Sequence, residues 1–382
     1  MRGSLVWLLT LWASLFIAPT AHAHKPSDSY LSIEVGDKAV SGQWDIALRD
    51  LDFAIGLDAD GDGNITWGET RAKHAEIAAY AVARLALQSN GATCAITVPQ
   101  QLVDRHTDGA YTVLQLQVSC PQSPTQLNQL TLGYKLFADI DPQHRGLLKL
   151  SAGGRTRTAV FSPDKPEQSF AVKEPASWFA QFIDYGREGV WHIWIGFDHI
   201  LFLLALLLPS VLVWHKPRWQ AASGFAPSFW EVAKIVTAFT LAHSITLSLA
   251  TLGWVSLPSR LVESAIAASV VLAALNNVWP VFQGRRWLVA FCFGLIHGFG
   301  FASVLADLGL PQDALLLALV GFNLGVECGQ LAIVAVFLPL AYSLRQHWVY
   351  QRLIFIGGSL LIAALAAVWL LERAFNLELV PF

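Results

Sequence analysis

The feature that most constrains this chain is a second half built from apolar segments long enough to cross a lipid bilayer. Six such segments can be recognised, at about 189–213, 230–251, 260–281, 287–306, 314–342 and 351–371. A membrane-spanning helix needs about 20 predominantly apolar residues, and each segment meets or approaches that length. The sequence therefore predicts a membrane domain of six transmembrane helices over 189–373, with the lipid bilayer as its first partner.

The composition agrees with this interpretation. Of the 382 residues, 54% are hydrophobic and only 14% are charged, which is typical of a membrane protein that also carries a water-soluble part. The net charge of -3 is too small to attract a charged polymer. We therefore expect no nucleic acid as a partner, and no particular protein partner is indicated.

Residues 1–23 have the features of a secretory signal peptide. Arg2 supplies the positive charge, 5–17 form a short apolar stretch, and 21–23 have the small residues of a cleavage site. A retained membrane anchor is the alternative, but the apolar stretch is short for one. Cleavage would leave His24 as the first residue of an exported domain over 24–175.

A β-rich, sandwich-like fold is predicted for 24–175. Apolar and polar residues alternate in short runs, as at 30–35, 111–118 and 130–137, which indicates antiparallel strands. One helix is expected over 67–87. Cys94 and Cys120 both fall in this exported part, where an even pair predicts a disulfide bond.

Residues 58–69 match the twelve-residue calcium loop of EF-hand proteins. Gly63 occupies the position of the sharp turn, and the oxygen ligands expected for Ca²⁺ are Asp58, Asp60, Asp62, Asn64, Thr66 and Glu69. The helical pattern before the loop is weak, so we expect a lone EF-hand-like loop with a dissociation constant of about 10⁻⁴–10⁻³ M. The alternative is an acidic surface turn.

The segment that joins the two parts contains Pro163, Pro166 and Pro175. Aromatic residues follow on one helical face, opposite polar ones, so 176–188 is expected to form a helix lying at the membrane interface.

The basic residues predict the orientation in the membrane. The loops after the first, third and fifth spans, with their helix ends, carry Lys216, Arg218, Lys234, Arg285, Arg286, Arg345 and Arg352. An excess of Lys and Arg marks the cytoplasmic side. The N-terminal domain and the C-terminus are therefore expected on the periplasmic side of a bacterial inner membrane.

Eight polar side chains lie inside these apolar segments or at their edges: His192, Asp198, His199, His243, Glu263, His297, Asn323 and Glu327. A carboxylate at the centre of a membrane helix costs roughly 2.5–3.5 kcal/mol on insertion scales, so such residues face the protein interior and mark functional sites. Imidazole and carboxylate groups suit divalent transition metals. The alternative is that these groups hydrogen-bond to one another and hold the helices together.

Spacing brings some of these residues together. His192 and His199 are two helical turns apart and share a face, and Asn323 and Glu327 are one turn apart. Gly294 and Gly298 have the spacing that lets two membrane helices approach closely beside His297.

The run His-Ile-Trp-Ile-Gly-Phe-Asp-His at 192–199 resembles the signature of the HupE/UreJ family, whose usual form is His-Pro-x-x-Gly-x-Asp-His. The blocks at 239–244, 262–264, 297–302 and 321–327 are also similar, and the resemblance covers about 180–373. It points to the larger subgroup with an exported N-terminal domain. Two departures, Ile193 in place of proline and a second His-rich signature reduced to His297, leave the metal open.

The resemblance implies a permease for nickel or cobalt, with other divalent metals as candidates. His192, Asp198 and His199 would form its entry or central site. The residues that would complete the coordination or pass the ion on are His243, Glu263, His297 and Glu327. No nucleotide-binding motif is found, so transport would be facilitated or ion-coupled. One alternative is an intramembrane zinc hydrolase that uses Ser264. Another is a non-transporting sensor or accessory protein.

His24 is a further candidate ligand. A terminal histidine offers an amine and an imidazole, a chelate that copper favours, whereas the plainer interpretation is that it merely follows the signal sequence.

Overall fold

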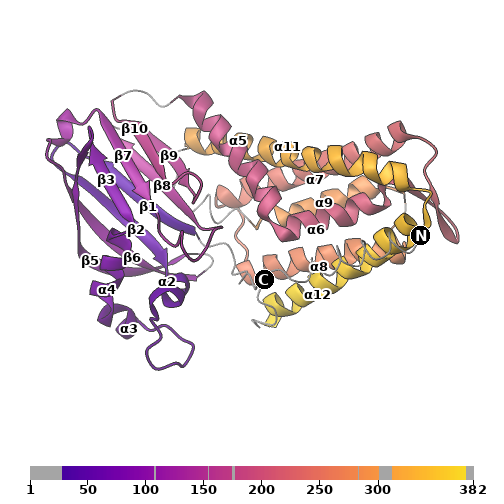
Figure 1. Cartoon of the computed structure of the whole chain (residues 1–382), viewed down its shortest axis with the longest axis horizontal. Coiled ribbons are helices and arrows are strands. Elements are labelled where there is room, and N and C mark those ends of the chain that lie inside the picture. Colours follow the sequence, from indigo (N-terminus) through magenta and orange to yellow (C-terminus); the bar gives the residue numbers. More distant parts are fainter. Residues whose placement is uncertain are drawn as a thin grey trace, which may run out of the picture.

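The computed structural model describes residues 28–106, 109–153, 155–173, 177–282, 284–300 and 312–375. They form a β-rich domain, drawn in indigo to magenta in Figure 1, and a bundle of long helices that follows it. The predicted signal peptide and His24 lie outside the described residues. A β-rich N-terminal domain followed by apolar helices was predicted from the sequence and is confirmed.

Two sheets make up the β-rich domain. The larger has the order β5-β6-β2-β1-β8-β9 and the smaller the order β10-β7-β3-β4. Their bounds are β1 Asp28–Val35, β2 Val40–Ala47, β3 Leu85–Ser89, β4 Ala92–Thr93, β5 Ala95–His106, β6 Gly109–Ser119, β7 Gln129–Tyr134, β8 Arg145–Ala152, β9 Arg155–Phe161 and β10 Glu167–Ala171. All pairs are antiparallel except β1 with β8, which is parallel. The long connection from β1 to β8 permits this parallel pairing, which alternation alone does not predict.

One core lies between the two sheets. Leu31 and Trp44 from the larger sheet and Leu87 and Leu132 from the smaller one are all at most 1% exposed and belong to one buried cluster. Alternate residues of a strand point to opposite faces, so the period-two pattern of the sequence becomes this shared core.

The predicted disulfide is present. Cys94 lies between β4 and β5, Cys120 directly follows β6, and the two sulfur atoms are bonded.

The helix expected over 67–87 is divided and shorter. α3 covers Trp67–Ala72, α4 covers His74–Val82, and the chain then enters β3. Leu85 and Leu87 alternate into the core and pair with β7, so tertiary pairing overrides helical propensity there. α2, Leu48–Ile55, precedes the acidic loop and is more regular than the weak pattern indicated.

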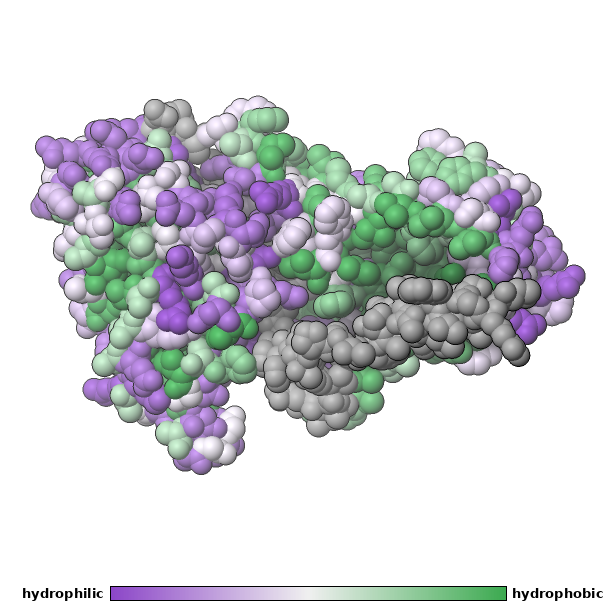
Figure 2. Space-filling model, viewed as in Figure 1, coloured by the Kyte–Doolittle hydropathy of each residue, from purple (hydrophilic) through white to green (hydrophobic). Residues whose placement is uncertain are grey.

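The helical bundle comprises α5 Trp178–Ile195, α6 Phe197–Leu207, η2 Leu208–Val211, α7 Phe225–Thr251, α8 Ser259–Val278, α9 Arg286–His297, α11 Gln312–Leu344, η3 Val349–Gly357 and α12 Gly358–Phe375. A hairpin of β11, Leu212–His215, and β12, Arg218–Ala221, projects after η2. Figure 2 shows hydrophobic residues covering the middle of the bundle, with hydrophilic residues over the β-rich domain and at the far end of the bundle.

Within the described ranges, four helices are long and apolar enough to cross a membrane: 225–251, 259–278, 315–344 and 349–375. α5 and the segment 197–211, which are bent by 74° relative to each other, count as a fifth if the pair is one broken span. α9 has 12 residues, is shorter than a full span and is followed by a turn at 298–300. The rest of the expected fourth span, 301–306, lies outside the described residues. Six spans remain a prediction, of which the structure describes four or five.

The expected boundary between an interfacial helix and the first span differs from the structure. α5 is one continuous helix through Ile195, and the break comes at Gly196 rather than at 188. Its first turn does expose aromatic residues, with Trp178 69% and Phe179 58% exposed.

The helices of the bundle pack in pairs, α5 with α11, α7 with α9 and α8 with α12. Glycines make the first pair close. The backbone of Phe322 in α11 lies against Gly189, and that of Gly186 lies against Gly325. Small residues at helix crossings let backbones approach in this way.

Candidate metal-binding sites

Four histidines from four different helices lie beside one another inside the bundle. The ring centroids of His192 on α5 and His199 on α6 are 4.5 Å apart, and those of His199 and His297 on α9 are 6.0 Å apart. His243 on α7 and His297 both pack on the ring of Phe239, at 6.0 and 5.2 Å. We call His192, His199, His243 and His297 the histidine cluster.

The bend between α5 and α6 builds one side of the cluster. The Gly196 amide donates to the His192 carbonyl and ends α5, and α6 then starts in a new direction with Asp198 in its first turn. The His199 Nδ1 and Asp198 Oδ1 atoms are 2.9 Å apart. A Cβ atom on Gly196 would lie 2.6 Å from that Nδ1, so only glycine leaves room for the pair. Broken helices of this kind line ion sites in membrane transporters.

A close crossing of α7 and α9 builds the other side. A Cβ on Gly294 would lie 2.5 Å from the Phe239 carbonyl oxygen, and one on Gly298 would meet the backbone of His243 and Leu247. The two glycines therefore bring His297 beside His243, as their spacing indicated.

Several nitrogen atoms of the cluster remain available. His297 Nδ1 lies 2.9 Å from the Phe293 carbonyl oxygen, to which it donates. Its Nε2 atom, and both ring nitrogens of His243, are buried and have no hydrogen-bond partner among the described residues. A ring held through Nδ1 by a carbonyl presents Nε2 as a lone-pair donor, which is how histidine ligands of metals are held. The exposed fractions of His243 and His297 are each 1%.

The other predicted members lie outside the cluster. Glu263 on α8 is 3.4 Å from Arg373 at the end of α12. Glu327 on α11 accepts a hydrogen bond of 2.8 Å from the Thr237 hydroxyl. Asn323, from the same helix, donates to the Leu319 carbonyl, while its own Oδ1 is buried without a partner. The structure thus gathers four histidines and Asp198, and leaves both glutamates in separate contacts.

One polar contact was missed by the sequence interpretation. Gln330 on α11 is 4% exposed and accepts a hydrogen bond of 3.1 Å from Thr240 on α7. It stands seven residues after Asn323 and so shares its face of α11. This spacing is the signal that could have found it.

The acidic loop lies between α2 and α3. Ligand atoms of Asp58, Asp60 and Glu69 all fall within 4.8 Å of one another, and within the described ranges no other three His, Cys, Asp or Glu side chains do so. Both Gly61 and Gly63 have positive φ angles, which makes the tight turn possible. These carboxylates are hard oxygen donors of the kind that Ca²⁺ prefers, so the residues fit the ion.

Glu69, in the first turn of α3, is held in place by hydrogen bonds from the loop that precedes the helix. The Thr66 backbone amide, the Thr66 hydroxyl and the Ala59 amide all donate to its carboxylate, and these bonds lower the pKa of Glu69 to about 2. The Asp62 carboxylate accepts from the Asn64 amide and is not among the three gathered carboxylates, whereas the Thr66 hydroxyl is bonded to Glu69.

No curated protein matches this chain. A family model described as "HupE / UreJ protein" does match, over residues 167–373. The matched region starts in β10 and extends across α5 to α12, including every member of the histidine cluster. Since this match covers more than half of the 382 residues, the chain belongs to the HupE/UreJ family.

Proposed function

We propose that the helical bundle carries a divalent transition metal across the membrane, with nickel or cobalt as the first candidates. The observation that supports this most is the histidine cluster. Four imidazoles from four helices meet inside an apolar bundle, and three of their nitrogens are buried without partners. Membership of a family associated with nickel and cobalt transport adds to the case.

The looseness of the cluster suits a transport site. No three of its ligand atoms lie within 4.8 Å of one another among the described residues, so it is not a closed structural site. Conduction requires sites that bind an ion well enough to admit it and weakly enough to release it. Adjoining histidines would each hold the ion in part and pass it on, while the Asp198 carboxylate offsets its charge.

The orientation and the acidic loop complete the proposal. The exported β-rich domain would lie on the periplasmic side of the inner membrane, where a disulfide persists. Asp58, Asp60 and Glu69 would bind Ca²⁺, with Asp62, Asn64 and Thr66 joining on binding. Calcium would then fix the loop between α2 and α3 and supply stability rather than transport.

A metal-uptake panel tests the transport proposal. Cells that express the full chain are offered nickel, cobalt, copper and zinc, and His199→Ala and Asp198→Ala are compared with the wild type. We expect each variant to fold and to lose uptake by about tenfold or more. His347→Ala is the matched control, because His347 is exposed and lies after α11, outside the cluster.

Other outcomes point to other functions. Metal binding with hydrolysis and without flux would support an intramembrane hydrolase, although the Ser264 hydroxyl donates to its own helix at Arg260. A phenotype only on removal of the exported domain would support an accessory role. Uptake that is unchanged in both variants would refute the role of His199 and Asp198, and a wild-type chain that takes up none of the four metals would refute the permease.

A further inference from the structure

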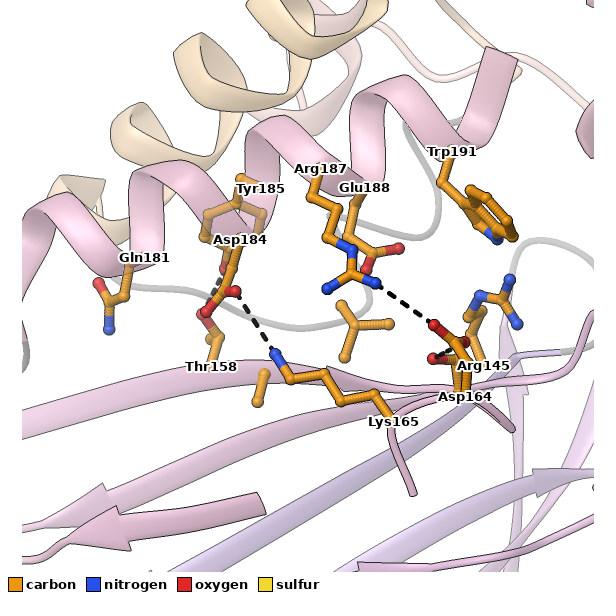
Figure 3. A pocket seen from close by; sticks show the side chains of 13 residues that line it. Arg145, Thr158, Asp164, Lys165, Gln181, Asp184, Tyr185, Arg187, Glu188 and Trp191 are labelled. Carbon is orange, nitrogen blue, oxygen red and sulfur yellow. Dashed lines mark hydrogen bonds and ion pairs between the residues drawn. The ribbon is translucent and has the colours of Figure 1, made fainter. Parts of the chain in front are cut away.

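Two hollows in the described part of the chain differ in their charges. The first lies between the β-rich domain and α5 and is lined by three basic and three acidic side chains. Ion pairs of 3.4 Å join Arg187 to Asp164 and Lys165 to Asp184 there (Figure 3), so these charges compensate one another and hold the two parts together. The second hollow is an open groove on α7 with a volume of about 590 Å³, and its lining includes one charged residue, Lys234.

One face of α7 forms this second hollow, which we call the α7 groove. Its lining residues on α7 run from Trp230 to Leu241 at the spacing of a helix face, and Trp287 on α9 adds a second wall. Ala233 and Ala238 contribute only methyl groups and so leave space between the larger side chains. The volume lies within the range of about 300–1,000 Å³ that is usual for ligand sites.

The α7 groove belongs to the helix pair that carries two members of the histidine cluster. α7 and α9 run in the same direction, because Gly294 meets the backbone of Phe239 and Gly298, four residues later, meets that of His243. Trp287 precedes Gly294 by two helical turns and therefore lies level with the first turns of the groove. The groove and the histidines are about 14 Å apart along the helix pair.

The groove begins at the edge of the apolar part of α7. The 17 residues of 235–251 contain no Asp, Glu, Lys or Arg, and they span about 26 Å, close to the hydrocarbon thickness of about 30 Å. Lys234 therefore lies where the hydrocarbon meets the lipid headgroups. Trp230 and Trp287, 63% and 41% exposed, line the groove beside it, and tryptophan is enriched at that depth. The part of the groove along Ala238 and Leu241 lies at the depth of the acyl chains.

The headgroup end of the groove is positively charged. Lys234 is exposed, and it forms no hydrogen bond or ion pair with any residue that the structure describes. Two acidic residues lie near it. The charge of Glu231 acts on Arg286, and Glu327 bonds to Thr237, one turn deeper in the membrane, and does not line the groove. A lysine in this position extends its ammonium group towards the headgroups.

We propose that the α7 groove binds one anionic phospholipid. The Lys234 ammonium donates to the lipid phosphate, the indoles of Trp230 and Trp287 lie beside the glycerol, and one acyl chain follows Ala238 and Leu241. An anionic lipid is favoured because the headgroup of a zwitterionic lipid carries a positive charge of its own, which Lys234 repels. The proposal goes beyond the proposed function and does not depend on transport. Because the lipid contacts both α7 and α9, it also fastens together the helix pair that bears the histidines.

The test counts the lipids bound to the purified full chain by native mass spectrometry, with phosphatidylglycerol and phosphatidylcholine of identical acyl chains as probes. We expect the wild type to bind phosphatidylglycerol about fivefold more tightly, because one lysine contributes about 1 kcal/mol towards anionic lipid. Lys234→Gln should bind the two lipids equally, and Lys234→Arg should keep the preference. Lys216→Gln is the matched control, because it removes an exposed cation between β11 and β12, outside the groove, and it should keep the preference too.

A further variant tests the hollow itself. Ala238→Phe fills the groove and leaves Lys234 in place, so it should weaken the binding of both lipids. Equal binding of the two lipids by the wild type would overturn the proposal, and so would a preference that survives in Lys234→Gln. A loss in Lys216→Gln as large as that in Lys234→Gln would show that binding follows net charge rather than this groove. The thermal unfolding midpoint identifies misfolded variants, and Lys234, being exposed, can be replaced without disturbing the packing of the bundle.

Discussion

The bend between α5 and α6 depends on a single glycine, and Gly196→Ala tests the reasoning about the site directly. The new Cβ would lie 2.6 Å from His199 Nδ1, 2.9 Å from the His192 carbonyl oxygen and 3.1 Å from Asp198 Oδ1. Non-bonded carbon contacts are comfortable at about 3.5–4.0 Å. The His199 ring must therefore move by roughly 1 Å, which breaks its 2.9 Å contact with Asp198.

The expected effect follows from that broken contact. A hydrogen bond that involves a charged group contributes about 1.5–3 kcal/mol, and each 1.4 kcal/mol is a factor of about ten in affinity. We therefore expect the half-saturating nickel concentration to rise by roughly 10- to 100-fold. Overpacking should also destabilise the fold by about 1–3 kcal/mol, less the small gain that alanine gives over glycine in the unfolded chain.

The assay is nickel uptake with the thermal unfolding midpoint measured in parallel. Gly358→Ala is the matched control, because a Cβ there would lie 3.7 Å from Leu208 Cδ1, an ordinary contact. That variant should transport like the wild type. Should Gly196→Ala saturate within a factor of two of the wild type and unfold at the same temperature, the close approach at the bend would not matter, and this account of the site would be wrong.

Three further predictions concern helix packing and the acidic loop. Gly298→Ala should lower both uptake and the unfolding midpoint, because its Cβ meets the backbone of His243 and Leu247 and the helices must separate; a variant that keeps both values would contradict the crossing. Removal of calcium with a chelator should lower the unfolding midpoint of the wild type but not that of Asp58→Asn. Scanning calorimetry measures both midpoints, and an equal fall in both would argue against a calcium site in this loop. Without calcium, the stabilisation from Glu69 is fully present above its ordinary pKa of 4.5 and is lost as the pH falls through its lowered pKa of about 2, so circular dichroism should show α3 melting only below about pH 4.

Local patterns predicted those parts of the fold that depend on neighbouring residues. The alternation in 30–35 became β1, and the apolar length of 230–251 became most of α7. The disulfide bond was predicted because an even number of cysteines falls in the part that was expected to be exported, and Cys94 and Cys120 are bonded to each other. In each case the physical cause lies within a short stretch of chain, where side-chain period or composition is sufficient.

Features set by distant contacts were harder to predict. The local sequence around 85–89 favours a helix, and only the pairing with β7 makes this segment a strand. The bend at Gly196 depends on where α6 packs, and a continuous helix through 188 depends on the approach of α11 to Gly189. Tertiary packing decides such boundaries.

The candidate site shows the same division. The histidines at 192 and 199 come together because of their spacing and the bend, and His297 joins them through its flanking glycines. The sequence also predicted that Glu263 and Glu327 belong to the metal site, because an acidic residue in an apolar span usually marks a functional site. Glu263 instead lies near Arg373 and Glu327 bonds to Thr237, partners on other helices that no spacing within one helix reveals.

α5 is one continuous helix that runs from the β-rich domain to the bend. Its 18 residues make it about 27 Å long, and its glycine contacts fasten it to α11 along that length. A rotation of the β-rich domain by about 5° would thus shift the far end of α5 by roughly 2 Å, and α11 would move with it. A partner that binds the β-sheets and rotates them would therefore also displace the imidazole of His192, which lies near the far end of α5.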